Sequence, residues 1–355
     1  MKRLILLLAL AMCVLGLCAD AAAEERETFV SGDFEYTLLE DGTAEITRYR
    51  GSAVSVNIPA ELDGRNVTAI GDWLFSHCSS LTSVTLPDSI TIIGDQAFSW
   101  CNSLVDITIP NNVTMIGDWA FSACTELTNI VIPDSVTYIG DYAFIRCSSL
   151  TAITIPDSVT TIGANPFTSC DQLSVVVISP DHPALATIDG VLFSKPDKRL
   201  IQYPIRKKEE SYQIPEGIKI IGDDAFTQCK NLVVVSIPDS VTVIGYYAFF
   251  GCSSLTDVTI PDSVTIIGGH AFTNCSGLTN VTIPDSVTTI EDYVFYNCEN
   301  LTNIMLPASI TSIGEDAFTD CPNLTLTVPR DSFAAQYCKD HNLSYIYPDS
   351  LDWLN

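Results

Sequence analysis

The chain has 355 residues, of which 43 are acidic and 17 are basic, so its formal net charge at pH 7 is −26. A surface this acidic repels phosphate backbones and anionic lipid headgroups, which excludes nucleic acid and membrane surfaces as partners. The length alone would allow two globular domains, but the internal repeats described below favour one stacked architecture.

Residues 1–23 have the layout of a secretory signal peptide. Lys2 and Arg3 form a basic start, residues 4–17 are largely apolar, and residues 21–23 are three alanines before Glu24. We expect cleavage after Ala23. Later in the chain no apolar run approaches the ~18 residues of a membrane span. The sequence therefore predicts a secreted or cell-surface protein with no membrane insertion.

Residues 24–58 are predicted to form an N-terminal β-hairpin cap. Two strand-like segments, 34–39 and 43–49, flank Asp41 and Gly42, a pair that favours a hairpin turn. Such a hairpin can cover the first apolar repeat, which would otherwise be exposed to water.

Residues 59–178 and 215–329 are predicted to be arrays of a 23-residue repeat. The period is marked by a proline that recurs at Pro87, Pro110, Pro133 and Pro156, and then at Pro215, Pro238, Pro261, Pro284 and Pro307. Each repeat carries an L-x-x-L-x-L core, such as Leu81-x-x-Val84-x-Leu86. A period of this length with this core indicates a leucine-rich repeat solenoid. We expect a right-handed superhelix of about 11 repeats, built from short parallel strands, turns and single helical turns.

Within a repeat, the alternation of apolar and polar residues predicts which side chains face inward. Val84 and Leu86 point into the core from a short strand, so that Ser83 and Thr85 point outward. A glycine such as Gly94 is expected to take a turn conformation closed to other residues. The segment from Ala97 to Cys101 is expected to form a single helical turn.

Two positions of the repeat are nearly constant. One is aromatic: Phe75, Phe98, Phe121, Phe144, Phe167, Phe226, Phe249, Phe272, Phe295 and Phe318. The other is cysteine: Cys78, Cys101, Cys124, Cys147, Cys170, Cys229, Cys252, Cys275, Cys298 and Cys321. We expect the rings to stack into a continuous spine. Because neighbouring strands lie ~4.8 Å apart and a disulfide needs Cβ atoms at ~3.8 Å, we expect free, buried thiols.

The rhythm breaks between the two arrays, where residues 179–214 are predicted to be an inserted β-hairpin. Residues 190–194 and 200–203 look like two strands around a polar turn. The insert is basic, with Lys195, Lys198, Arg199, Arg206, Lys207 and Lys208. Two interpretations stay open: a structural insert with a solvated tip, or a patch for an acidic partner such as a second copy of this chain.

Residues 330–355 are predicted to form a C-terminal cap. Residues 331–341 have helical composition, and the segment from Ser344 to Tyr347 resembles a strand.

The repeat motif Leu-Thr-x-Ile/Val-Thr-Ile-Pro-Asp-Ser-Val-Thr-x-Ile-Gly-x-x-Ala-Phe-x-x-Cys resembles the BspA-type bacterial leucine-rich repeats over roughly residues 55–329. The segment from Asp189 to Lys195 is also similar to an element of that family. The resemblance implies the solenoid fold and a place among surface and secreted proteins, some of which are adhesins for host matrix proteins or other bacteria. It carries over no ligand-binding residue, because the shared positions belong to the core.

The sequence does not predict an enzyme, a cofactor or a metal site. Its four histidines, His77, His182, His270 and His341, are widely separated, and no nucleophile, metalloprotease or phosphate-loop motif occurs. Aspartates recur after the corner proline and after the repeat glycine. Each of these columns offers one carboxylate per repeat, whereas Ca²⁺ needs 6–8 converging oxygens. We therefore expect solvated turns with local amide bonds.

Two surfaces remain as candidates for recognition. On the turn face, aromatic residues follow the repeat glycine by two positions at Trp73, Trp119, Tyr142, Tyr247 and Tyr293. On the strand face, an outward column holds Asp106, Asn129, Asp257, Asn280 and Asn303. The aromatic side chains could grip a partner or lie flat over neighbouring turns, and both interpretations stay open.

Three hypotheses for function follow from these surfaces. The first is a secreted protein-binding module, such as an adhesin, with an unidentified protein partner. The second is a glycan-binding protein that uses the aromatic row. The third is a surface-layer protein that self-associates through the basic insert.

Overall fold

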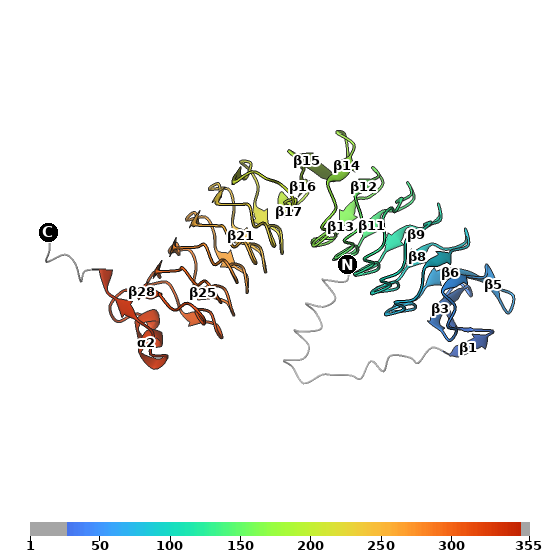
Figure 1. The fold of residues 1–355 in the computed structure, drawn as a ribbon, viewed down its shortest axis with the longest axis horizontal. Coiled ribbons are helices and arrows are strands. Elements are labelled where there is room, and N and C mark those ends of the chain that lie inside the picture. The colour runs from blue at the N-terminus through green and yellow to red at the C-terminus, as the bar shows by residue number, and fades with distance from the viewer. Residues whose placement is uncertain (1–26, 349–355) are drawn as a thin grey trace.

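The repeats stack into one arched solenoid (Figure 1). The computed structural model describes residues 27–348, so the predicted signal peptide lies outside the described residues. The 23-residue repeats form parallel turns of the leucine-rich repeat kind, as expected, and the stack has about 13 of them. The number exceeds the expected 11 because strands of both caps join the stack in parallel: β3 (Ala44–Tyr49) pairs with β6 (Arg65–Ile70), and β29 (Tyr345–Ile346) pairs with β28 (Thr325–Thr327).

The N-terminal end is covered by an antiparallel meander. β1 (Thr28–Ser31) pairs with β2 (Phe34–Leu38), and β2 pairs with β3 across the turn at Asp41 and Gly42. A short β5 (Glu61–Leu62) pairs with β6 in the first, longer repeat. Because β3 also pairs in parallel with β6, this meander continues directly into the stack.

One side of the solenoid, the strand face, is a ladder of parallel strands in two blocks. The first block consists of β4 (Ser55–Asn57), β7 (Ser83–Thr85) and β9 (Asp106–Ile107), followed by β12 (Ala152–Ile155) and β14 (Val175–Ile178). The second consists of β18 (Ser211–Gln213), β20 (Val234–Ser236), β22 (Asp257–Thr259), β24 (Asn280–Thr282), β26 (Asn303–Met305), β28 and β29. Side chains alternate buried and exposed along these strands, as the period-two pattern predicts.

A second ladder of short strands precedes the repeat glycines. In the N-terminal array it runs through β6, β8 (Ile92–Ile93), β10 (Met115–Ile116), β11 (Tyr138–Ile139) and β13 (Thr161–Ile162). In the C-terminal array it runs through β17 (Arg199–Gln202), β19 (Ile220–Ile221), β21 (Val243–Ile244) and β23 (Ile266–Ile267), and β25 (Thr289–Ile290) pairs with β27 (Ser312–Ile313).

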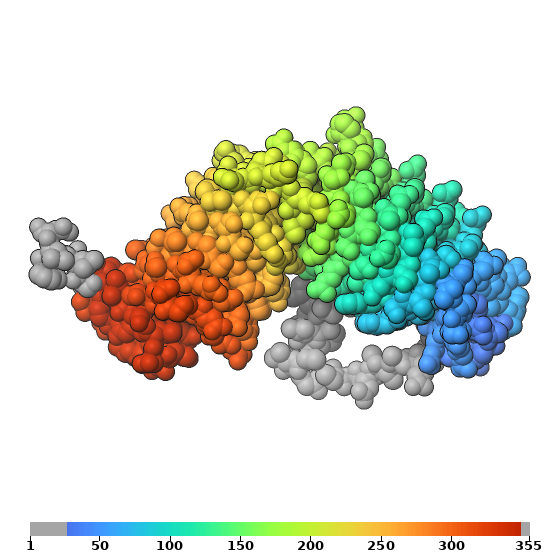
Figure 2. Space-filling view, in the orientation of Figure 1, coloured from blue at the N-terminus to red at the C-terminus, as the bar shows by residue number. Residues whose placement is uncertain are grey.

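The segment predicted as the insert, residues 179–214, lies at the middle of the arch (Figure 1), and its last strand, β18, already belongs to the strand face of the second array. β15 (Leu185–Ile188), β16 (Val191–Ser194) and β17 form an antiparallel sheet, and β17 pairs in parallel with β19. The sequence indicated the β16–β17 hairpin but not β15. The space-filling view shows the insert between the two arrays, near the top of the arch (Figure 2).

The core is divided in two at this insert. One cluster of buried side chains runs from Tyr36 to Ile201, and a second runs from Val191 to Cys338. Phenylalanine rings stack within each array at 4.9 to 6.1 Å between centroids. The expected continuous spine is therefore wrong at one place: Tyr203 of the insert stands before Phe226, with centroids 5.1 Å apart.

The C-terminal end is closed by α2 (Phe333–Asp340) and β29. Ser332 caps the helix, because its hydroxyl accepts a hydrogen bond from the backbone N–H of Ala335 at 3.1 Å. Ala334, Ala335 and Cys338 are the buried face of the helix. No helix within residues 27–348 combines the length and apolar character needed to cross a membrane.

Candidate ligand-binding surfaces

The turn face is the side of the solenoid that carries the segment after each repeat glycine, and it is built from consecutive β-turns. The expected single helical turn around residues 97–101 is wrong, because alternate amides bond to different repeats. The N–H groups of Trp73 and Phe75 donate to Asp95 and Ala97 of the next repeat, at 2.9 and 2.8 Å, while that of Ser76 donates back to Trp73. Two residues of each segment, such as Trp73 and His77, take a positive φ. Stacking thus gives the backbone amides of this segment hydrogen-bond partners that an isolated repeat could not provide.

Aspartates and glycines of successive repeats pack closely against one another on this face. The amide of Asp118 donates to Oδ1 of Asp95 at 2.8 Å, and the amide of Asp141 donates to Oδ1 of Asp118 at 2.8 Å. The repeat glycines do not have a positive φ, so the conformational reason expected for Gly94 is wrong. A Cβ at Gly94 would instead lie 2.5 Å from Oδ1 of Asp72. Glycine is required by close approach, and the carboxylates are used in amide bonds.

The predicted aromatic residues do lie in a row on the turn face, but the row is divided into separate groups of rings. The rings of Trp119 and Tyr142 stack with centroids 4.5 Å apart, whereas Trp73 lies alone and exposed, separated from them by Gln96. In the other array Tyr247 and Tyr293 are joined through a third ring, His270, at 4.5 and 4.7 Å. All these aromatic residues have a positive φ. Because neighbouring rings cover each other's faces, much of the row is packed against itself.

His270 is the member of this row that the sequence prediction missed. It occupies the same repeat position as Tyr247 and Tyr293, two residues after Gly268, so the period alone could have placed it there. Burial lowers the pKa of its imidazole, and the nearby charge of Asp292 opposes that effect. The ring is therefore neutral at pH 7 and stacks between two tyrosines.

Tyr142 joins the two arrays across the insert. Its hydroxyl donates a hydrogen bond to Oδ2 of Asp224 at 2.9 Å, although the two residues are 82 positions apart. Thr227 donates to the other carboxylate oxygen, Oδ1, at 2.9 Å. Burial raises the pKa of Asp224, and these two hydrogen bonds oppose the shift. Tyr142 therefore has a structural partner within the chain.

The outward column of the strand face lies where the alternation placed it. Asp106, Asn129, Asp257 and Asn280 are exposed, and Asn303 is half-buried. Oδ1 of Asn303 accepts a hydrogen bond from Thr327 at 2.8 Å. These five side chains belong to two separate blocks of strands, so the structure does not bring all of them together.

The basic residues of the insert are largely engaged within the chain. Lys195 donates to the carbonyl of His182 at 2.6 Å, Arg199 pairs with Asp197 at 3.1 Å, and Lys207 pairs with Glu209 at 3.4 Å. Arg206 donates to the carbonyl of Asp171 and so ties the insert to the preceding repeat. Lys198 and Lys208 are the exposed cations of the predicted partner patch that have no such bond among residues 27–348.

The cysteine column is a ladder of free thiols. Cys101, Cys124 and Cys147 donate to the carbonyls of Phe75, Phe98 and Phe121 at 3.2, 3.2 and 3.1 Å, and the pattern continues in the other array. All the cysteines of the described chain are unpaired. Between residues 27 and 348, no group of three or more possible ligands is placed to hold a metal ion.

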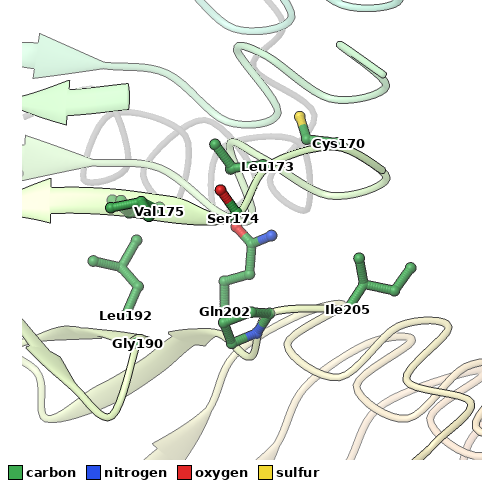
Figure 3. A pocket seen from close by; sticks show the side chains of 10 residues that line it. Cys170, Leu173, Ser174, Val175, Gly190, Leu192, Gln202 and Ile205 are labelled. Atoms are coloured by element: carbon green, nitrogen blue, oxygen red, sulfur yellow. The ribbon is translucent and has the colours of Figure 1, made fainter. Parts of the chain in front are cut away.

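An apolar cavity of about 200 Å³ lies at the junction of the N-terminal array and the insert. Leu173 and Val175 line it from the last repeat of the array, and Leu192, Gln202 and Ile205 line it from the insert (Figure 3). Oε1 of Gln202 is buried and has no hydrogen-bond partner within the described chain. The cavity exists because the strand ladder is interrupted here: β14 pairs with β12 alone, and β18 begins a separate sheet.

The parallel 23-residue turns and the surfaces they present define a bacterial leucine-rich repeat solenoid. A model of the BspA-type leucine-rich repeat region matches residues 52–195 and 206–325, so the chain belongs to this family. A comparison with curated proteins finds no match.

Solved structures of bacterial leucine-rich repeat proteins resemble the chain over most of its length. A leucine-rich cell surface protein from Faecalibacterium prausnitzii is 32% identical, covering 89% of this chain and 98% of that one, with a TM-score of 0.68. A leucine-rich repeat protein from Eubacterium ventriosum is 28% identical, covering 85% and 84%, with a TM-score of 0.70. The pneumococcal vaccine antigen PcpA is 19% identical over 90% and 98%, with a TM-score of 0.60, a likeness of fold alone.

Proposed function

We propose that the chain is a non-catalytic protein-binding module of the bacterial cell surface, which holds a partner protein against the strand face beside the insert. The observation that carries this proposal is a group of exposed valines. Val131, Val175 and Val177 are 68%, 50% and 46% exposed. Val177 lies directly beside Thr154 in the pairing of β12 with β14, and Val131 occupies the same column one repeat before Thr154.

Val131 and Val177 stand in a column where most repeats carry a polar residue. The column of Val131 and Val177 holds threonine in most repeats, as at Thr85, Thr154 and Thr259. Threonine has nearly the same shape as valine and suits a strand equally well, so folding does not require valine at an exposed position. Exposed apolar side chains gathered within a polar rim are typical of a protein interface.

The junction cavity provides an anchor next to this patch. Val175 belongs to both, and the cavity behind it is lined by Leu173, Val176 and Leu192. A partner segment running along the unpaired edge of β14 could place an apolar side chain in this cavity. Its N–H group could bond to Oε1 of Gln202.

The family and the structural neighbours support this proposal at a coarser level. The similar protein from Faecalibacterium prausnitzii is a cell surface protein. The resemblance to BspA-type proteins suggests an adhesin, with a host matrix protein or a bacterial surface protein as the partner.

The test is a binding screen of the chain without residues 1–23 against purified matrix proteins, bacterial surface proteins and a glycan array. For a protein partner, Val131→Thr combined with Val177→Thr should weaken binding at least about tenfold, because it makes the patch polar without changing side-chain volume. Met305→Thr is the matched control, since Met305 occupies the same column in the other array and is also exposed. Capture of glycans alone, or equal loss in both variants, would contradict the proposal.

A further inference from the structure

Three neighbouring repeats of the C-terminal array depart from the consensus at one point of the turn face. In most repeats a glycine is followed by an aspartate whose carboxylate accepts the amide of the next repeat, as Asp223 does from Tyr246 at 2.8 Å. Tyr246 and Gly269 replace this aspartate in two successive repeats, and Glu291 replaces the glycine in the third. The departures lie in adjacent repeats, so they meet in space.

The three substitutions compensate one another. Oε2 of Glu291 accepts the amide of Gly269 at 2.8 Å, which restores the bond that the missing aspartate would have made. Gly269 leaves room beside the ring of Tyr246, because a Cβ there would lie 3.3 Å from a ring carbon of Tyr246. The nearby carboxylate of Glu291 raises the pKa of the Tyr246 phenol. The three substitutions thus preserve the hydrogen bonding between repeats but change the side chains that the turn face exposes.

The result is an open hollow of about 550 Å³ on the turn face. Its walls include Tyr246, Tyr247, His270, Glu291, Asp292 and Tyr293. Tyr246 is 52% exposed. The hollow therefore combines two carboxylates, several phenol oxygens and the apolar body of a partly exposed ring.

The surrounding array makes this hollow strongly negative. Residues 231–329 contain no lysine or arginine, while every repeat in that range contributes at least one carboxylate. Within residues 231–329 the charges of Glu291 and Asp292 consequently have no lysine or arginine to pair with, and the two lysines of the array, Lys219 and Lys230, lie before that range. A cation supplied from outside would fill that role.

We propose that this hollow binds a lysine or arginine side chain of a basic protein segment. The carboxylate of Asp292 and the phenol oxygens can accept hydrogen bonds from an ammonium or guanidinium group, and the ring of Tyr246 can pack against its stem. A pyranose ring is a poorer fit, because it needs an exposed aromatic face and the rings of Tyr247, His270 and Tyr293 lie parallel against one another. The site lies on a different face and array from the apolar patch.

The test measures fluorescence anisotropy of a labelled peptide of alternating glycine and lysine, titrated with the chain lacking residues 1–23 at low salt. Glu291→Gln should weaken binding about tenfold, because glutamine can still accept the amide of Gly269 but removes one charge. Tyr246→Asp restores the repeat consensus and adds negative charge, yet it should also weaken binding severalfold because it removes the ring. Thermal melting of both variants verifies that each is folded.

Asp262→Asn is the matched control, an equal change of charge at an exposed corner of the same array. It should leave binding within about twofold, and so should the valine variants of the strand face. An equal loss with Asp262→Asn would show diffuse charge attraction and overturn the proposal. So would displacement of the peptide by equimolar spermidine, which would indicate a free polyamine site, or Tyr246-dependent binding of a neutral oligosaccharide without binding of the peptide.

Discussion

Most buried cysteines of the two arrays donate the thiol hydrogen to the carbonyl of a phenylalanine one repeat earlier, whereas Cys229, the first of its array, donates to the carbonyl of Thr227 at 3.9 Å. Cys147 bonds to Phe121, and Cys275 bonds to Phe249, both at 3.1 Å. A serine hydroxyl could make such a bond but would cost more to bury, and alanine would leave the carbonyl unpaired. Cysteine is therefore a weak donor that the apolar core tolerates.

Burial sets the reactivity of these thiols, and Cys321 at the end of the column differs from the others. Burial raises the pKa of the Cys101 and Cys252 thiols to about 12, whereas the neighbouring Cys298 side chain lowers the pKa of the half-exposed Cys321. Since the thiolate is the reactive form, an aromatic disulfide reagent at pH 7 should modify Cys321 at least about tenfold faster than the buried cysteines.

Mass-spectrometric mapping of the modified peptides over time would measure this difference. The Cys321→Ser variant should lose the fast phase and keep the slow reaction that follows unfolding. Modification of Cys147 in the folded chain at the rate of Cys321 would contradict the prediction.

At the scale of a single repeat, the tightest constraint is the close approach of most repeat glycines to the aspartate one repeat earlier. A Cβ on Gly140 would lie 2.4 Å from Oδ1 and 2.5 Å from the backbone nitrogen of Asp118. Because a backbone atom is involved, a side-chain rotation cannot relieve the clash. We expect Gly140→Ala to destabilise the chain by about 3 kcal/mol, the upper range for overpacking.

Thermal and denaturant unfolding would measure that loss. Gly32→Ala is the control, because Gly32 has a φ of +58° and no neighbouring atom within 4 Å of the added Cβ. Backbone strain alone should make that variant less stable by about 1 kcal/mol. A smaller effect for Gly140→Ala than for Gly32→Ala would show that the close approach is not what selects glycine.

The sequence predicted the parts of the repeat that depend on its period. The 23-residue spacing placed Phe98 and Phe121 in one stack, and the alternation in β7 placed Ser83 outside and Val84 inside. It failed for the segment around residues 97–101, since its hydrogen bonds run to the next repeat and leave no local pattern. The period of the sequence shows which features the repeats have in common, whereas these hydrogen bonds depend on how neighbouring repeats are stacked.

The candidate surfaces were predictable only as columns. Exposure of Asp106 and Asn280 follows from strand alternation, and the position of Tyr247 follows from the period. The period could not show that Tyr142 bonds to Asp224, because the irregular insert separates them. Nor could it show the cavity beside β14, which arises where two regular arrays meet without pairing.

At the scale of the whole molecule, the two arrays are separate stacks joined at one seam, the junction at the insert. Their cores are separate clusters, and neither strand ladder continues across the insert. The turn face is fastened by the bonds of Tyr142 to Asp224 and of Arg206 to Asp171, while the strand face is left open at the cavity. The partner surface proposed beside β14 lies at this seam, so binding there would also brace the two arrays.

The charge of Asp224 makes the stability of this seam depend on pH. Burial raises the pKa of Asp224, so the folded state favours the protonated carboxyl more than the unfolded chain does. The stabilisation linked to this proton is complete below the usual aspartate pKa of about 3.8 and is lost as the pH rises through the higher folded value. At pH 7 the buried carboxylate of Asp224 therefore lowers the stability of the junction between the two arrays.

Asp224→Asn should remove that destabilisation without breaking the seam. Asparagine keeps one oxygen for Thr227, its amide group can donate to the oxygen of Tyr142, and it tolerates the φ of +53° at this position. We expect the melting temperature to rise by about 2 °C at pH 7, and the gain to shrink as the pH falls towards 3.8, because burial makes wild-type Asp224 take up its proton above that pH. Asp157→Asn, at an exposed corner, controls for net charge and should show neither effect. A gain of the same size at pH 4 would instead point to backbone preference, and a loss at pH 7 would mean that the carboxylate holds the two arrays together.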